Sequence, residues 1–534
     1  MQTIPASGVI AQSSRRARRS YEGFTAWSVS PQRLAELAVP RFFGPTGTLD
    51  DRDYWGRGLE SNGFPYMLSI YFGVPALLLV VAGASGGCRA ELPRRSLAAL
   101  SGIAIVLSLG RWLPGFRFIY DFVPLVTRFR YPIKALIAAA LPLSLLAGCG
   151  LASIAESRRR VAFTIAALAA IVGIALVVSD DFTAAFASLF SFVNPSRTQL
   201  GGSLAHVAIA AAAFAVAVSL PRHREVAMAA VVVLDLAVAG ASVNVYAPRS
   251  LFDTPPIAGT VRGAIRDGRF HAAERQVLLS SPSNDLRWLA RWQMSSLAWY
   301  TAANFGIPVI FHADYDGLAP RRIAALSAIV DRLPWRRRLP LLEIAGVGCF
   351  ATADVLPAPA VTEIARIETP RQPIRFYALP AGAPARFVSA VDLVRDEAGA
   401  AMRLVNAADP SRVTLQRAPL PAGGCGTAPV AITSRTLNSA SYGVDAPCSG
   451  YVVFAESDYD GWRASVDGNP SEILNADYAF TAVAVRAGKH SIERRFTQPG
   501  LVAGAVTSSC ALLLLVPLAA YLRRRTTVGA TDPG

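Results

Sequence analysis

The apolar residues of this chain are gathered into long runs that are almost free of charge. A helix needs about 20 apolar residues to cross a bilayer; seven runs are interpreted as spanning helices, of which several are near that length and the second is short. The seven runs are Tyr66–Ala84, Leu97–Leu109, Ala135–Ile154, Val161–Ser179, Ser203–Leu220, Val226–Ser242 and Leu501–Leu522. The pattern predicts a polytopic α-helical membrane protein with about seven transmembrane helices.

The long polar segment before the last run shows two different patterns. Residues 250–355 mix helical spacing, as in Arg321–Leu333, with short strand-like runs such as Val347–Ala351. From about Arg375 onward, apolar and polar residues alternate with period two, which is typical of strands. The expected strands are Tyr451–Ala455, Trp462–Val466, Ala479–Arg486 and His490–Phe496, with Asp467-Gly468 and Ala487-Gly488 as turns. These patterns predict a mixed α/β domain followed by a small antiparallel β-sandwich.

Arginine clusters orient the predicted helices. The positive-inside rule places short Arg-rich loops in the cytoplasm. Four groups of arginines fall on one side if all seven helices exist, namely Arg94-Arg95, Arg158–Arg160, Arg222 with Arg224, and Arg523–Arg525. We therefore expect an extracytoplasmic segment 1–65, a six-helix transmembrane region 66–243, an extracytoplasmic α/β domain 244–374, an extracytoplasmic β-sandwich-like domain 375–500, and a last helix with a basic cytoplasmic tail 501–534.

Composition supports a membrane protein rather than a nucleic-acid-binding one. Of 534 residues, 52% are hydrophobic and only 17% are charged, whereas soluble proteins carry about a quarter charged residues. The net charge of +15 comes almost wholly from arginine, because Lys134 and Lys489 are the only lysines. Many arginines stand between apolar runs, where they orient helices, so we expect no nucleic-acid partner.

The N-terminal segment does not fit this topology easily. It contains no apolar signal segment and carries the basic cluster Arg15–Arg19, although the topology requires it to cross the membrane. We therefore expect the chain to be the C-terminal part of a longer protein or one half of a split pair. In the second case, a separate chain would supply the preceding helices.

The outer loop Gly110–Pro132 holds the most informative cations. Pro132 suits the first turn of a helix, so Arg128, Arg130 and Lys134 would surround a helix N-terminus, with Arg117 nearby. Unpaired N–H groups, the helix dipole and bidentate arginines all favour an anion there. A phosphate of a lipid carrier is the predicted ligand. The alternative is pairing of these cations with lipid headgroups or with Asp121.

Other polar residues are weaker candidates. Asp235 lies inside an apolar run, where carboxylates are costly, and His206 is its nearest plausible partner; a structural hydrogen bond is the expected role. Cys425 and Cys448 could form a disulfide if their domain is extracytoplasmic. The acidic stretch Asp50–Asp53 could hold a divalent metal or supply a general base, although such loops are usually just solvated. No cofactor motif is evident.

Aromatic, amide and acidic residues also cluster in the first part of the polar segment. Such side chains suit sugar binding through stacking and hydrogen bonds, and an ordinary loop is the alternative. The residues considered as acceptor or glycan contacts are Trp299, Asn304, His312, Asp314, Tyr315 and Asp316. The later stretch Ser457–Trp462 is interpreted as a turn that leads into a buried tryptophan.

Several stretches give the chain a family resemblance. They include Trp27–Gly44, Arg128–Lys134 (RFRYPIK), Asp314–Leu318 (DYDGL) and, above all, Asp460–Phe496. In these the chain resembles the YfhO family of bacterial membrane proteins, which are similar to the GT-C class of multi-spanning glycosyltransferases. The resemblance implies a multi-pass protein of the bacterial cytoplasmic membrane that transfers sugar from a polyprenyl-phosphate carrier to a cell-envelope acceptor on the outer face.

The catalytic residue implied by that resemblance maps to no residue here. In GT-C enzymes a carboxylate in the first outer loop usually serves as base, and this sequence begins after that point. We therefore expect the C-terminal portion of a glycosyltransferase that is not active alone. The alternatives are a non-catalytic glycan-binding or assembly module and a lipid-linked sugar transporter, which is disfavoured because repeated halves are not evident.

Overall fold

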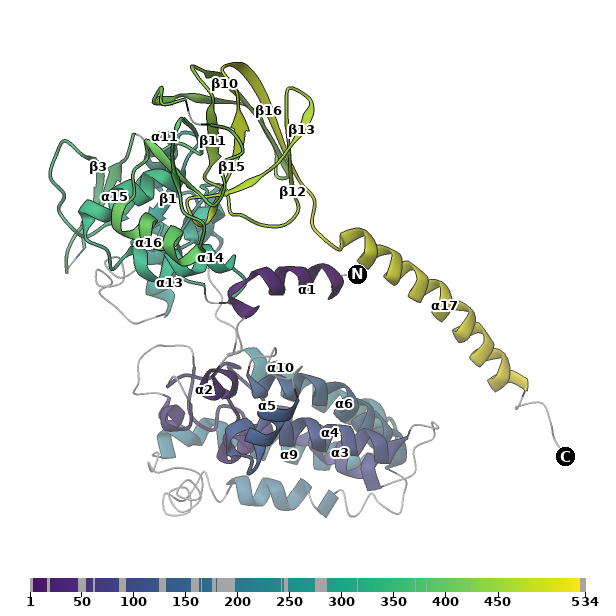
Figure 1. Ribbon diagram of the computed structural model, residues 1–534. Coiled ribbons are helices and arrows are strands. Elements are labelled where there is room, and N and C mark those ends of the chain that lie inside the picture. The colour runs from purple at the N-terminus through teal and green to yellow at the C-terminus, as the bar shows by residue number, and fades with distance from the viewer. Residues whose placement is uncertain are drawn as a thin grey trace. The chain divides into compact units, whose positions relative to one another are not determined.

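The computed structural model of the chain contains two compact units. It describes all residues except 1–2, 17–19, 47–53, 61–62, 86–92, 124–130, 155–162, 165, 175–178, 180–196, 242, 244–247, 274–285, 315, 370, 381, 422 and 529–534. One unit, called here the helical unit, comprises Arg18–Pro248 and Ser283–Trp288. The other, called the mixed unit, comprises Met1–Ala17, Arg249–Pro282 and Leu289–Gly534. Figure 1 shows the helices of the first and the sheets of the second.

The helical unit is built from apolar helices with short 3-10 turns between them. Helices α3 and α6 pack so closely that a methyl group at Gly83 would overlap the Leu146 carbonyl oxygen, and one at Gly150 would overlap that of Leu79. Small residues at these crossings let the two backbones approach. The elements are α2 (Tyr21–Thr25), η2 (Pro31–Leu37), η3 (Trp55–Leu59), α3 (Val74–Ser85), α4 (Arg94–Ser108), η4 (Gly110–Trp112), α5 (Phe116–Phe122), η6 (Pro132–Lys134), α6 (Ala135–Ser153), α9 (Arg197–Ser219) and α10 (Arg224–Ala241).

Two helices among the described residues are long and apolar enough to cross a membrane. They span Pro132–Ser153 and Leu200–Ser219, and the shorter apolar helices are Val74–Ser85 and Leu501–Pro517. The first predicted span was partly wrong, because residues 66–73 are not helical. The backbone φ of +100° at Gly73 interrupts the run just before α3 begins. The number of about seven spans and their topology remain predictions.

Exposed apolar side chains continue along the helices of this unit. Leu141 of α6, Val233 of α10 and Ile103 of α4 all lie on the surface. In a soluble protein this much exposed aliphatic surface would be unfavourable, whereas in a bilayer it faces lipid. These helices therefore have the side-chain distribution of a membrane protein.

The first part of the mixed unit is an α/β domain around a four-stranded sheet. The strand order is β1-β2-β4-β3, with β1 parallel to β2 and the other pairs antiparallel. Its core includes Phe350, Tyr377 and Trp335, whose rings stack in series. The elements are η7 (Arg249–Phe252), α11 (Pro256–Ile265), β1 (Arg269–Ala272), α13 (Leu286–Ser296), η8 (Thr301–Phe305), α14 (Arg321–Val330), α15 (Trp335–Ile344), β2 (Val347–Thr352), β3 (Thr362–Ile367) and β4 (Ile374–Ala378).

The second part of the mixed unit is a two-sheet β structure. A seven-stranded sheet has the order β6-β7-β14-β15-β11-β5-β8, and a five-stranded sheet has the order β13-β12-β16-β10-β9. The side chains between them form a buried core that includes Phe387, Tyr442, Phe454 and Ile492. The elements are β5 (Ala385–Val388), β6 (Ala390–Leu393), α16 (Glu397–Ala407), β7 (Arg412–Leu415), β8 (Thr427–Ala428), β9 (Val430–Arg435), β10 (Ser439–Ala446), β11 (Gly450–Phe454), β12 (Trp462–Val466), β13 (Asn469–Ser471), β14 (Leu474–Ala476), β15 (Phe480–Val485) and β16 (Gly488–Phe496).

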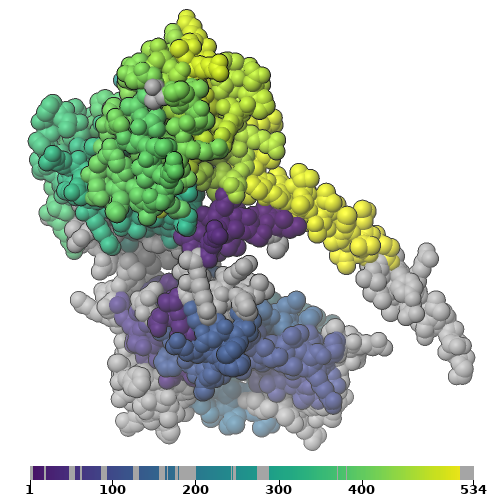
Figure 2. Space-filling view, viewed as in Figure 1, coloured from purple at the N-terminus to yellow at the C-terminus, as the bar shows by residue number. Residues whose placement is uncertain are grey.

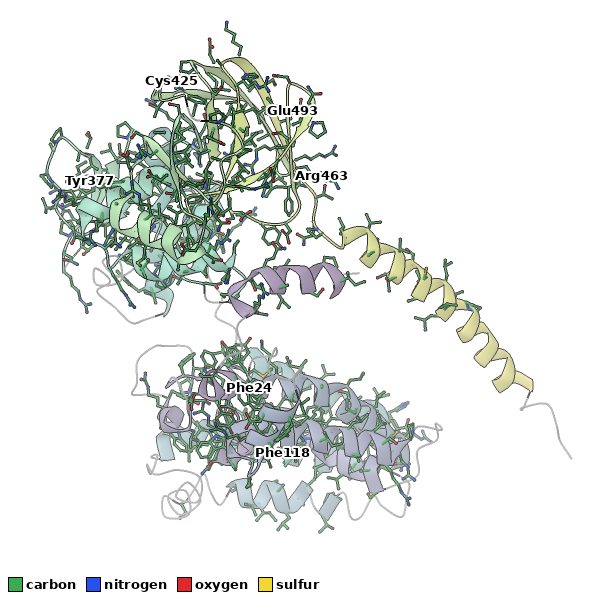
Figure 3. The ribbon with its side chains drawn as sticks, viewed as in Figure 1. Phe24, Phe118, Tyr377, Cys425, Arg463 and Glu493 are labelled. Carbon is green, nitrogen blue, oxygen red and sulfur yellow. A yellow bond between two sulfur atoms is a disulfide. The ribbon has the colours of Figure 1, made fainter. Side chains whose placement is uncertain are left out.

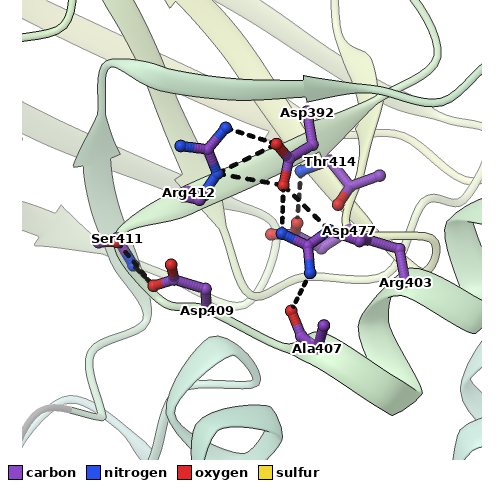
Figure 4. Close-up of polar contacts among 8 residues, drawn as sticks. All are labelled: Asp392, Arg403, Ala407, Asp409, Ser411, Arg412, Thr414 and Asp477. Atoms are coloured by element: carbon purple, nitrogen blue, oxygen red, sulfur yellow. Dashed lines mark hydrogen bonds and ion pairs between the residues drawn. The ribbon is translucent and has the colours of Figure 1, made fainter.

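This sandwich departs from a purely antiparallel one at its edge. Strands β6 and β7 pair in parallel and are connected through helix α16. Asp392 of β6 accepts hydrogen bonds from Arg403 of α16, at 2.7 Å, and from Arg412 of β7, at 3.0 Å (Figure 4). The bonds from Arg412, and then those from Arg403, lower the pKa of the Asp392 carboxyl. One carboxylate thus ties the two parallel strands to their connecting helix.

Disulfide bonds occur in both units. Cys425 and Cys448 of the sandwich are joined, and Figure 3 shows Cys425 in a loop, away from Arg463 and Glu493 on the exposed strands β12 and β16. Cys149 of α6 is also disulfide-bonded. The sandwich disulfide closes a loop of moderate length, which stabilises the fold by restricting the unfolded chain.

Two terminal helices complete the mixed unit. Helix α1 (Thr3–Gln12) contacts helix α17 (Leu501–Val528) near its start, as Figures 1 and 2 show. A methyl group at Gly500 would lie only 3.1 Å from Ile4. The apolar residues Leu512–Val516 of α17 are largely exposed, as expected of a helix meant for lipid.

Candidate functional site

A cleft of about 620 Å³ lies within the mixed unit, between the α/β domain and the sandwich. One wall consists of residues between 309 and 320, which follow η8, and of helix α14. The other comes from the β9–β10 hairpin, the loop after β11 and the ends of β12 and β16. Charged and aromatic residues on these walls include Arg269, His312, Asp316, Arg435, Glu456, Tyr459, Trp462 and Phe496. A cavity of this size, with a few polar groups among aromatic rings, is typical of a small-ligand site.

The part of the sandwich wall formed by Glu456, Tyr459, Trp462 and Phe496 is called here the floor of the cleft. The Glu456 carboxylate is paired with Arg494. The Arg494 side chain is fully buried, and it forms an ion pair with one oxygen of the Glu456 carboxylate. Its guanidinium group also lies over the rings of Phe454, at 4.3 Å, and Trp462, at 4.6 Å. Burial lowers the pKa of Arg494, and the Glu456 charge opposes that effect. The second oxygen, Oε1, takes no part in this ion pair, and Glu456 lines the cleft.

Two further side chains bring polar groups to the same floor. The Tyr459 hydroxyl is buried and has no hydrogen-bond partner among the described residues, while the ring packs 5.9 Å from that of Phe496. Burial also lowers the pKa of Arg269, again opposed chiefly by Glu456. An unsatisfied buried hydroxyl costs about 1–3 kcal/mol unless a ligand or water bonds to it. The floor is therefore suited to a ligand with several hydroxyl groups.

The loop Phe311–Pro320 supplies the predicted acidic residues of the opposite wall. Asp314 is less available than expected, because its carboxylate accepts hydrogen bonds from the Ser14 hydroxyl and from the Ala319 amide at 3.1 Å. Partial burial raises the pKa of Asp314, but these hydrogen bonds outweigh it and lower the pKa overall. Asp316 accepts from the Leu318 amide at 2.9 Å. Asp314 thus shapes the loop, and Asp316 and His312 remain as lining residues.

An N-terminal arm, residues 3–16, connects the two walls of the cleft. Ser14 and Arg15 bind the loop, with the Ser14 amide donating to the Ala319 carbonyl at 3.2 Å and the Arg15 Nε donating to the Asp316 carbonyl at 2.7 Å. On the other wall, the Asp460 amide donates to the Gln12 side chain at 2.8 Å. The arm therefore restrains the width of the cleft.

The remaining predicted glycan contacts do not join this site. Trp299 and Asn304 are absent from the walls of the cleft, and the Asn304 amide faces the Met294 sulfur at 3.5 Å. Tyr315 lies outside the described residues. His312, Asp314 and Asp316 do line the cleft, and their role as glycan contacts remains a prediction. The other wall could have been suspected from Ser457–Trp462, where two aromatics flank acidic residues, but it was interpreted only as a turn.

The predicted anion site of the helical unit is described in part. Arg128 and Arg130 fall outside the described residues. Lys134 ends the 3-10 turn that Pro132 starts, directly before α6. The Lys134 ammonium group is exposed and lies over the rings of Tyr66, at 5.2 Å, and Tyr131, at 5.1 Å. A cation held by two rings at the start of an apolar helix remains suited to an anion.

Arg117, the fourth predicted cation, has other contacts. Its Nε lies 3.7 Å from an oxygen of Asp121, one turn along α5, and its guanidinium group lies 5.4 Å from the Tyr21 ring centre. Both side chains of the pair are exposed, so the interaction is weak. The pairing with Asp121 considered from the sequence therefore exists for Arg117.

Asp235 and His206 form a polar contact among apolar helices. The His206 Nε2 lies 2.7 Å from Asp235 Oδ1, and the Tyr71 hydroxyl donates to the same oxygen at 2.8 Å. Asp235 is buried at the crossing of α9 and α10, next to Gly73, where a methyl group would lie 2.7 Å from Oδ2. This geometry fits the expected structural hydrogen bond.

A second buried polar cluster in the helical unit was not predicted. Arg33 pairs with Glu36 at 3.0 Å and with Glu60 at 2.9 Å, and the Tyr54 hydroxyl donates to Glu60 at 3.3 Å. Burial raises the pKa of both carboxyl groups, and Arg33 opposes the shift. One arginine between two buried acids locks this segment together. The spacing of these residues in the sequence does not predict the cluster.

Metal binding finds no support in the described part of the chain, where no group of three or more His, Cys, Asp or Glu side chains could hold an ion. The acidic stretch Asp50–Asp53, considered for a metal or a general base, lies outside the described residues.

Comparison with known proteins gives one match. Residues 427–508 match the family described as bacterial membrane protein YfhO. This range begins at β8, includes the sandwich residues that form the floor of the cleft, and ends in α17. No curated protein and no solved structure matches the chain.

Proposed function

We propose, from the membership of this chain in the YfhO family of bacterial membrane proteins, that it acts in the transfer of sugar to a cell-envelope glycan or lipid on the outer face of the membrane. The sugar would come from a polyprenyl-phosphate carrier. The cleft of the mixed unit would hold the acceptor, and Arg128, Arg130 and Lys134 would bind the carrier phosphate.

The observation that carries this proposal is the composition of the cleft floor. The Tyr459 hydroxyl and Glu456 Oε1 offer hydrogen bonds beside the rings of Trp462 and Phe496. Saccharides are recognised by such combinations, since their hydroxyl groups need partners and their C–H faces pack on aromatic rings. Arg269 and Arg435 add donors at the side of the floor.

The described carboxylates argue for binding rather than proton transfer in the cleft itself. Asp314 is committed to Ser14 and Ala319, and Glu456 is ion-paired with Arg494. A general base must take up a proton, and protonation of Glu456 would remove the ion-pair partner of the buried Arg494 guanidinium group. This observation favours, as a second candidate function, a membrane-anchored module that binds or assembles glycans without catalysis. It also agrees with a catalytic residue contributed from elsewhere.

Transfer of labelled sugar in membrane vesicles separates the two candidates. The full-length protein would be assayed with a polyprenyl-phosphate sugar and a crude envelope acceptor, alongside an Arg128→Ala, Arg130→Ala double variant. An Arg222→Ala, Arg224→Ala variant serves as control, because it removes the same charge from a loop predicted on the other side.

Transfer that is lost only in the first variant, with normal protein levels, supports the phosphate-binding role. Normal transfer by that variant would refute it. Saccharide binding in the absence of any transfer would favour the non-catalytic module.

A further inference from the structure

The mouth of the cleft is apolar, in contrast to its floor. Leu437, at the tip of the β9–β10 hairpin, lines the cleft and is 100% exposed. Leu318, on the opposite wall, also lines it and is 38% exposed. Large aliphatic side chains exposed on both walls of one cavity are unfavourable in water, so this pair of leucines needs an explanation.

The hairpin tip that carries Leu437 is rigid. The Thr436 hydroxyl accepts hydrogen bonds from the Asn438 amide, at 3.3 Å, and from the Ser439 amide, at 3.1 Å. The Thr436 amide donates to the Ser439 carbonyl at 2.8 Å. These hydrogen bonds close the turn and place Leu437 at its tip. Polar residues or glycine usually occupy such a position, whereas here it is a leucine.

We infer that the cleft takes an amphiphilic saccharide, whose sugar occupies the floor and whose apolar aglycone leaves between Leu437 and Leu318. This rests on the proposed function and narrows it, because it assigns the acceptor to the glycolipid class instead of a free polysaccharide. The sugar hydroxyls bond to Tyr459 and Glu456, and the aglycone covers the two leucines.

Pairs of glycosides that differ only in the aglycone test the inference. Methyl and hexyl β-glycosides of glucose, galactose and N-acetylglucosamine would be titrated against the full-length protein in nanodiscs. Affinity would be measured by saturation-transfer NMR, which also reports whether ring or alkyl protons touch the protein. Empty nanodiscs correct for partition of the hexyl chain into lipid.

The expected result is that the hexyl member of at least one pair binds roughly tenfold more tightly, the effect of burying part of a leucine-sized surface. Leu437→Ser should abolish this difference and leave the methyl glycoside unchanged. Leu393→Ser, which alters a 52% exposed leucine of β6 outside the cleft, should preserve it.

Equal affinity within every pair, or a difference that survives Leu437→Ser, would overturn the inference and leave sugar binding intact. Failure of all six glycosides to bind would overturn the proposed glycan site, and the inference with it.

Discussion

Replacing Glu456 by alanine should destabilise the sandwich strongly, because it leaves the buried Arg494 charge without its ion-pair partner. Arg494 has no exposed side-chain surface, and among the described residues it forms its ion pair with Glu456. In the variant the guanidinium group would keep its hydrogen bonds to Tyr442 and, at 3.0 Å, to Thr481, together with its two ring contacts. None of these supplies a compensating negative charge.

The magnitude follows from the cost of breaking a buried pair. Removing one partner of such a pair costs about 3–5 kcal/mol. The two cation–π contacts, which burial strengthens, offset little of this because the wild-type protein has them too. Glu456→Ala should therefore destabilise the sandwich by roughly 3–5 kcal/mol. The Glu456→Ala, Arg494→Met double variant removes both charges and should recover most of that loss.

Hydrogen exchange on the full-length protein measures this change locally. Amides of β11, β15 and β16 should exchange about two to three and a half powers of ten faster in Glu456→Ala, since each 1.4 kcal/mol is tenfold. Amides of α6 in the helical unit serve as the internal control and should not change. Exchange within a few-fold of wild type in the sandwich, or a double variant no more protected than the single one, would refute this account of Arg494.

Three other perturbations have defined outcomes. Gly150→Ala should separate α3 from α6 and lower the melting temperature, whereas Gly148→Ala on the same helix, where a methyl group meets nothing within 4 Å, should have little effect. Reducing the sandwich disulfide should cost about 3 kcal/mol for its loop of 23 residues, measurable as faster exchange in that domain alone. Because the pKa of Asp314 is lowered in the folded protein, its ionised carboxylate stabilises the contact with the arm at pH values above the ordinary carboxyl pKa. This stabilisation is lost as the pH falls through the lowered pKa. Protection of residues 312–320 should fall over that acid range, and Ser14→Ala should move the loss to higher pH; an unchanged profile would contradict the role of the arm.

Local pattern was enough to predict much of the fold. Period-two alternation placed β12 at its observed bounds, and the expected helix Arg321–Leu333 corresponds to α14. The Asp467-Gly468 turn joins β12 to β13, with positive φ at both residues, as such hairpins require. Ala487-Gly488 is different, because the strands on either side of it belong to different sheets. Alternation alone does not say which sheet a strand joins.

The candidate site was harder to predict because its two walls are far apart in sequence. The Asp314 loop and the Glu456–Trp462 stretch are separated by about 140 residues, and only the packing of the α/β domain on the sandwich brings them together. The burial of Arg494 could not be predicted, because nothing in its sequence neighbours shows that the rings of Phe454 and Trp462 lie against it. Conversely, Trp299 and Asn304 were predicted from residue type alone, which does not indicate where a side chain points. Long-range packing decides which polar residues share a cavity.

Binding of a saccharide in the cleft is the central claim, and the most direct test is a glycan-array measurement with the full-length protein in nanodiscs. Tyr459→Phe removes a single buried hydroxyl and keeps the ring. If that hydroxyl bonds to the sugar, the variant should bind the glycan with roughly tenfold lower affinity. Tyr300→Phe, outside the cleft, should bind as the wild type does. Binding that drops only in Tyr459→Phe is the predicted result; an array without any bound glycan, or equal binding by both variants, would contradict it.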